Sequence, residues 1–121
     1  MSSNSSSSEP VIDAEAIENL RAINPDDSSF LKEIIGIFIE DTPARIAELR
    51  AAMASGDVSA FSRAAHSIKG SSSNLGAARL RSLAERLEHD SKSQPLTNFN
   101  HGLSELEEAF AATKSELERL E

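Results

Sequence analysis

The stretch Ala64-Ala65-His66-Ser67-Ile68-Lys69-Gly70-Ser71-Ser72-Ser73-Asn74-Leu75-Gly76 lies near the middle of the 121-residue chain. On a helix that turns about 100° per residue, its apolar and small residues fall on one face together with Phe61. That face consists of Phe61, Ala64, Ala65, Ile68, Ser72 and Leu75. The pattern predicts an amphipathic helix that packs this face inward, and the other helices are expected to pack around it.

A histidine, a lysine and a glycine gather on the outer side of the same helix. His66 lies about 140° from Phe61, so its imidazole is expected in solvent, and Lys69 follows one turn later. Glycine inside a helix costs about 0.5–1 kcal/mol relative to alanine. Gly70 is on the side opposite the core, where no neighbouring helix needs room. We infer that Gly70 gives a bulky partner access to His66 and that the Lys69 ammonium meets an anion, which together predict a phosphate acceptor site.

The run from His66 to Gly76 resembles the signature of histidine-containing phosphotransfer (HPt) domains of two-component phosphorelays. That signature reads His, any residue, aliphatic, Lys, Gly, several small residues, aliphatic and Gly, and the sequence matches it at each position. The resemblance implies that His66 accepts a phosphoryl group from a receiver-domain aspartate of a hybrid sensor kinase. It then passes the group reversibly to the aspartate of a response-regulator receiver. The resemblance also implies a carrier rather than an enzyme, without its own ATP site or cofactor, because the partner receiver supplies Mg²⁺.

The composition of the chain argues against several classes of partner and location. The net charge is −8, from 20 acidic and 12 basic residues, which argues against nucleic acid or an anionic membrane as a partner. There is no cysteine, no apolar run near the ~20 residues of a membrane span, and no secretory pattern in the first ten residues. We therefore expect a cytoplasmic protein with one domain, and a monomer because one polar face is reserved for partners.

The remaining pattern predicts an all-α fold. Residues 1–9 are serine-rich and are expected to form a disordered tail, and residues 10–121 the helical domain. Predicted helices cover about 12–23, 28–55, 58–74, 77–91 and 95–120, with Asp13 and Asp57 as caps and glycines 56 and 76 as stops. The four long helices should form an antiparallel up-down four-helix bundle with the short N-terminal helix as a lid.

The second of these helices contains Pro43 and opens with an apolar stripe of Phe30, Ile34, Ile37 and Phe38. Two interpretations fit the proline. Thr42 could cap a new helix with Pro43 at its first position, or one long helix could continue with a kink at Pro43. The resemblance favours the long helix.

Two carboxylates are candidates to orient His66. The third and fourth helices are joined by a tight turn, so Glu85 and Glu88 lie near the level of His66. A carboxylate that accepts a hydrogen bond from Nδ1–H would fix the tautomer and leave Nε2 as the nucleophile. The family often has such an acceptor on this helix, and we favour Glu88 over Glu85; the alternative is that both are solvated surface residues.

Other polar residues have weaker patterns. Arg63 and Arg86 could contact phosphate or a partner, or could be ordinary exposed residues. The docking patch is expected around His66 and to include Ser59, Ser62, Arg63 and Ser73. His89 and His101 are expected to be surface residues, and no metal-ligand spacing or phosphate-binding loop is present.

Two other classes of function remain open at this stage. One is a helical adaptor of the same fold whose histidine is not phosphorylated. The other is a small hydrolase or phosphohistidine phosphatase, which would need a second catalytic group beside His66.

Overall fold

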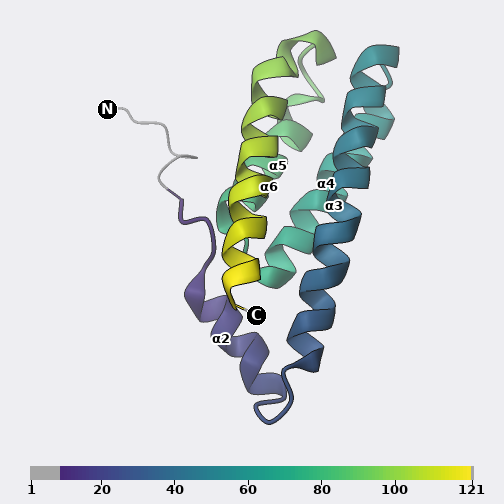
Figure 1. Cartoon of the computed structure of the whole chain (residues 1–121). Coiled ribbons are helices and arrows are strands. Elements are labelled where there is room, and N and C mark those ends of the chain that lie inside the picture. Colours follow the sequence, from purple (N-terminus) through teal and green to yellow (C-terminus); the bar gives the residue numbers. More distant parts are fainter. Residues whose placement is uncertain (1–8, 121) are drawn as a thin grey trace.

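The computed structural model describes residues 9–120, and within them the chain folds into an antiparallel helical bundle (Figure 1). The elements in order are α2 (Ala14–Ile23), α3 (Ser29–Ser55), α4 (Val58–Leu75), α5 (Ala78–Asp90), the 3₁₀-helix η1 (Leu96–Phe99) and α6 (Asn100–Leu120). The four long helices α3 to α6 lie side by side, and α2 lies across one end of them. No strand occurs between residues 9 and 120. The predicted all-α bundle with a short N-terminal lid is confirmed.

Each long helix contributes an apolar stripe to one continuous core. Side chains with almost no exposed surface come from α3 (Leu49), α4 (Phe61, Ile68), α5 (Leu80) and α6 (Leu106). Burying one such side chain stabilises the fold by about 1.5–3 kcal/mol. The predicted inner face of α4 is buried in full, which fixes the rotation of this helix and directs its opposite face to solvent.

The helix ends follow the capping residues in the sequence. The Asp57 carboxylate accepts a hydrogen bond from the Ala60 N–H at 3.0 Å, and Asp13 does the same for Glu15 at 3.0 Å. Gly56 and Gly76 end α3 and α4 with left-handed φ angles of 73° and 70°. These local signals explain why the predicted boundaries of α2 to α5 agree with the structure to within a residue or two.

For two details of the bundle, the sequence-based prediction was either left open or is wrong. The helix α3 continues through Pro43 without a break, so of the two interpretations the single long helix is correct. Pro95, by contrast, does not begin the last α-helix, as the sequence suggested. Pro95 precedes η1, and α6 begins only at Asn100. The side chains of Leu96 and Phe99 in η1 are buried in the core. The Phe99 ring stacks on Phe61, with ring centroids 5.4 Å apart.

The apolar stripe at the start of α3 is only partly buried. Leu31 and Ile35 are in the core, but 60% of Ile37 and 37% of Phe30 are exposed. The first turns of α3 extend beyond the end of α4, and α2 and the C-terminal end of α6 lie beside them (Figure 1). The buried face of α3 runs through Leu31, Ile35 and Phe38, and Ile37 lies about 100° around the helix from Phe38.

The segment before α2 is fastened to the turn between α4 and α5. The predicted tail lies outside the described residues except for Glu9, whose carbonyl accepts two hydrogen bonds from the Arg79 guanidinium at 3.1 and 3.0 Å. The Asp13 N–H donates to the Gly76 carbonyl at 2.7 Å. The lid thus rests on the α4–α5 turn, and Gly76 is the residue that it contacts.

Replacing Gly76 by alanine should destabilise the protein more than replacing Gly56 by alanine. Both glycines have left-handed backbones, for which an L side chain costs about 1–2 kcal/mol. A Cβ at Gly56 would meet open space, whereas one at Gly76 would lie 2.4 Å from the Ala16 Cβ and 3.2 Å from the Asp13 carbonyl oxygen. We expect Gly76→Ala to lose at least about 1 kcal/mol more in the free energy of unfolding, measured with urea. Equal losses in the two variants would show that α2 does not constrain this turn.

Candidate functional site

His66 stands on the outer face of α4, with its neighbour Ala65 fully buried behind it. Its side chain is 66% exposed. A helix with a buried inner face holds this ring at a fixed point on the surface while leaving it open to a partner. The imidazole is therefore rigidly placed and accessible.

Glu88 on α5 contacts the ring from the side. Its Oε2 atom lies 3.0 Å from His66 Nδ1, and the side chain is 15% exposed. Glu85, the other candidate, instead pairs with Arg81 one turn earlier on α5, at 3.2 Å. With Nδ1 carrying the proton, this geometry makes Nδ1–H the donor to Glu88 and leaves the Nε2 lone pair unused.

Lys69 also contacts Glu88, which the sequence did not predict. Its Nζ lies 2.9 Å from Oε1 of the same carboxylate, and its side chain is 27% exposed. The sequence suggested a lysine directed toward an anion on the imidazole. A signal for the ion pair was present, because Lys69 falls on the flank of α4 that faces α5, on the same side as His66.

The two contacts change the acidity of Glu88. Partial burial opposes ionisation of this carboxyl and is the largest single influence, but the hydrogen bonds from Lys69 and then His66, with their charges, outweigh it. Together they lower the pKa of Glu88 below its ordinary value. The carboxylate is therefore ionised throughout the neutral range.

Gly70 leaves the surface beside His66 bare. A methyl group added there would meet no atom within 4 Å. The absence of a side chain is thus not required by packing inside the chain, which agrees with the idea that Gly70 serves a partner.

The remaining candidates are not gathered around the ring. Arg63 donates a hydrogen bond to Ser59 at 2.8 Å and lines a groove of about 540 Å³ between α3 and α4, on the flank away from Glu88. Arg86 and His89 are exposed on α5, and His101 lies 3.8 Å from Glu105 on α6. Ser62 is half-buried and Ser73 is exposed. Among the described residues, no group of three His, Asp or Glu side chains could hold a metal ion.

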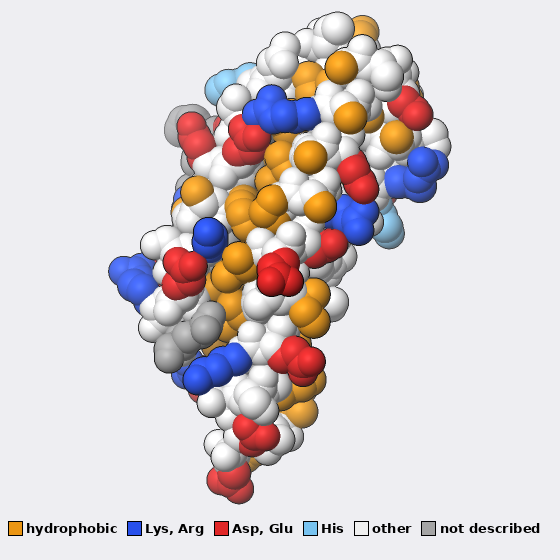
Figure 2. Space-filling view, turned by 45° about the vertical axis from the view of Figure 1, so that its right-hand side comes forward, with side chains coloured by type: hydrophobic (Ala, Val, Ile, Leu, Met, Phe, Trp, Pro, Cys, Tyr) orange, Lys and Arg blue, Asp and Glu red, His pale blue; other side chains and the backbone are white. Residues whose placement is uncertain are grey.

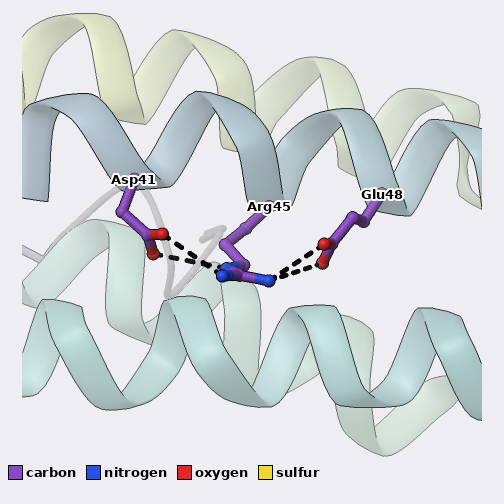
Figure 3. Close-up of polar contacts among 3 residues, drawn as sticks. All are labelled: Asp41, Arg45 and Glu48. Carbon is purple, nitrogen blue, oxygen red and sulfur yellow. Dashed lines mark hydrogen bonds and ion pairs between the residues drawn. The ribbon is translucent and has the colours of Figure 1, made fainter.

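Two surface features near the site were not named from the sequence. On the rim of the α3–α4 groove, Arg45 is held between Asp41 and Glu48, with N–O distances of 3.2 and 2.9 Å (Figure 3). On another side of the bundle, apolar side chains follow the groove between α3 and α6, where Pro43, Ile46 and Phe110 lie (Figure 2). No helix in residues 9–120 is long and apolar enough to cross a membrane.

Comparison with known proteins agrees with this fold. The sequence model of the Hpt domain matches residues 33–121, and the chain belongs to this family. It is similar in structure to histidine-containing phosphotransfer protein B (HptB) from Pseudomonas aeruginosa PAO1, with 26% identity and a TM-score of 0.79 over 93% of this chain and 95% of that one. No curated protein matches at a significant level.

Two further solved structures share the fold. The phosphotransfer protein MtHPt2 from Medicago truncatula is 23% identical, with a TM-score of 0.80 over 91% of this chain and 76% of that one. The HPT domain of a sensor hybrid histidine kinase from Shewanella is 15% identical, with a TM-score of 0.68 over 89% and 95%. The chain therefore has a histidine phosphotransfer role in two-component phosphorelays, as its family does.

The stability supplied by Glu88 should depend on pH. The pKa of Glu88 is lower in the folded state than its ordinary value of 4.5. Ionised Glu88 therefore stabilises the fold at pH values above 4.5, and this stability is lost as the pH falls through the pKa of the folded state. We expect Glu88→Gln to lose about 1–2 kcal/mol in the free energy of unfolding at pH 7 and much less at pH 3.

Glu85→Gln is the matched control on the same helix. Its carboxylate forms an exposed pair with Arg81, which contributes only about 0.3–0.5 kcal/mol. Urea unfolding of both variants at the two pH values checks the prediction. A Glu88→Gln loss that is the same at pH 3 and pH 7 would contradict it.

Proposed function

We propose that this protein is a phosphorelay intermediate in which His66 carries the phosphoryl group. It accepts the group from a phosphoaspartate of a receiver domain, as in a hybrid sensor kinase, and passes it reversibly to the aspartate of a response-regulator receiver. The observation that supports this most directly is the ring itself, which is held at Nδ1 by Glu88 and open to solvent elsewhere. A nucleophile that must meet two different proteins needs both properties.

The chemistry needs no proton to leave the ring during transfer. The Nε2 lone pair attacks phosphorus, the N–P bond forms, and the P–O bond to the aspartate breaks with the carboxylate as leaving group. The imidazole then carries a positive charge on a ring that keeps Nδ1–H, and the Glu88 carboxylate at 3.0 Å stabilises that charge. The same steps run backward when the phosphoryl group passes to the next receiver.

Positioning and charge neutralisation account for most of the catalysis of phosphoryl transfer. On this protein His66 supplies the nucleophile, Glu88 orients it, and Gly70 gives the receiver access. Lys69, one turn from His66, is the nearest cation on α4 for the transferred group. The Mg²⁺ and the aspartate come from the receiver, so the carrier needs neither an ATP site nor a cofactor.

We place the docking surface on the outer face of α4 and on the flank of α3 that exposes Phe30 and Ile37. Ser59, Ser73 and Arg63 are exposed on α4 near His66. Ile37 and Phe30 expose large apolar side chains on α3, and along the α3–α4 hairpin Ile37 is level with the end of α4, about 15 Å from the level of His66. Exposed apolar residues beside a polar rim are typical of protein–protein contacts, which supports a protein as partner. We expect the free carrier to be a monomer in the cytoplasm.

Replacing His66 by glutamine tests the proposal. The protein is incubated with phosphorylated receiver domains, and the parent should acquire a phosphate that is labile to acid and stable to alkali, while His66→Gln acquires none. Glutamine retains a polar, exposed side chain, so the helical circular dichroism should be unchanged. A folded parent that accepts no phosphate from any receiver but still binds one would favour the adaptor, and turnover of a free phosphorylated substrate would favour the hydrolase.

Replacing Gly70 by leucine should slow transfer while leaving the fold intact. Leucine forms helices better than glycine by about 0.5–1 kcal/mol, so the variant should be slightly more stable than the parent. An added Cβ at Gly70 meets no atom of the chain within 4 Å, and the leucine side chain would meet the receiver, so we expect transfer to fall by about tenfold or more.

Gly36→Leu on α3 is the matched control, because Gly36 is an exposed helical glycine whose added Cβ would also meet open space. Gly36 lies seven residues before Pro43, on the flank of α3 that faces α6, and not on the flank that exposes Phe30 and Ile37. Gly36→Leu should gain a similar amount of stability, and it should transfer phosphate at the parental rate. Rates are measured as transfer of labelled phosphate between a receiver and the carrier. Normal transfer by Gly70→Leu would disprove the access role of Gly70.

A further inference from the structure

The carboxylate of Glu88 is shared between two partners on α4. Its Oε2 lies 3.0 Å from His66 Nδ1, and its Oε1 lies 2.9 Å from Lys69 Nζ. Glu88 and Lys69 are mostly covered, at 15% and 27% exposed, while the His66 ring is 66% exposed. Three charged or ionisable groups therefore form one connected unit in which Glu88 is the centre.

A carboxylate beside an imidazole has two opposing effects. It fixes Nδ1–H as a donor and so directs the Nε2 lone pair outward. It also favours the imidazolium, in which Nε2 is protonated and has no lone pair for attack on phosphorus. An orienting carboxylate thus reduces the amount of reactive histidine unless another cation offsets its charge.

We propose that Lys69 is a positioning residue that acts through Glu88: it offsets the carboxylate charge, so that Glu88 orients the His66 ring while the ring stays neutral and nucleophilic. This inference rests on the proposed function of His66 as phosphoryl acceptor. It gives Lys69 a role before any phosphate arrives, in addition to the neutralisation of the transferred group.

The other charges on α4 and α5 are engaged elsewhere or exposed. On α4, Arg63 is directed to Ser59. On α5, Arg81 and Glu85 pair with each other one to two turns before Glu88, and Arg86 and His89 are exposed. Among the described residues, Lys69 is the cation in direct contact with Glu88.

The helices that pack on the other sides of α4 carry arginines that are already paired with carboxylates. On α3, Arg45 is held by Asp41 and Glu48 on the far flank of α4 (Figure 3). On α2, which packs at the end of α4 away from His66, Arg21 pairs with Glu18. Neither group replaces Lys69 as a counter-charge for Glu88.

The test is the titration of the His66 imidazole in the unphosphorylated protein, followed by NMR. Removing the Lys69 charge with Lys69→Gln should move the titration midpoint upward by about half a unit to one unit, because the positive charge on the other oxygen of Glu88 is lost in a partly screened site. Lys69→Arg keeps the charge and should leave the midpoint near the parental value. Glu88→Gln should move it downward.

The double variant Lys69→Gln/Glu88→Gln shows whether Lys69 acts through Glu88. Without the carboxylate, Lys69 loses its partner, so its removal should shift the midpoint by less than half as much as in the parent. An equal shift in both backgrounds would overturn the proposal, as would an unchanged midpoint in Lys69→Gln alone. Lys114→Gln, at an exposed lysine on α6, is the control and should leave the titration midpoint of His66 unchanged.

Transfer rates give the second measurement. Relative to the parent at the same pH, the loss of transfer rate in Lys69→Gln should be larger at pH 6 than at pH 8.5, because a ring with a higher affinity for protons loses its Nε2 lone pair at the lower pH. A deficit that is the same at both pH values would mean that Lys69 acts on the phosphoryl group alone and would overturn the proposal. The titration needs no receiver, so failure of the proposed relay and failure of this inference are distinguishable.

Discussion

The tight left-handed turn at Gly76 is the constraint on which the site depends. It returns the chain from α4 into α5 so closely that the two helices run side by side, and it sets which residue of one lies opposite which residue of the other. Glu88 contacts His66 because of this register. One residue added between Gly76 and Glu88 would rotate Glu88 by about 100° around α5 and remove it from His66. The lid α2 secures the same turn through the Asp13–Gly76 hydrogen bond.

The class of fold and the exposed face of α4 could be predicted because both follow from local patterns. A stripe of apolar residues with helical period buries one face, so His66 on the opposite face is exposed in any helical packing. Asp57 and Gly56 act within their own turns, so the helix boundaries that they set do not depend on the rest of the molecule. The roles assigned to His66, Lys69 and Gly70 stay predictions until transfer is measured.

The contacts between helices could not be predicted to the same degree. Glu85 and Glu88 are three residues apart, which separates them by about 4.5 Å along α5 and about 60° around it. Choosing between them needs the register and the rotation of two helices together, and the sequence alone gives neither to that precision. The Lys69–Glu88 pair was missed for the same reason. The exposure of Ile37 was missed because its apolar spacing with Phe30 and Ile34 predicts a buried stripe. The buried positions at the start of α3 are instead Leu31, Ile35 and Phe38, and Ile37 lies about 100° around the helix from Phe38.

The ring of His66 is mostly exposed, and this suits a carrier. An enzyme that surrounds its substrate gains by burying the reacting atoms, but a carrier must present one atom to two partners in turn. Arg63 and Ser67 line the α3–α4 groove, while His66 between them on the sequence projects on the other flank beside Glu88. The groups that orient the ring are mostly covered, and the ring is not. In the relay proposed above, water exclusion and the metal come from the bound receiver, so that transfer occurs within a complex and the free carrier holds the phosphoryl group between partners.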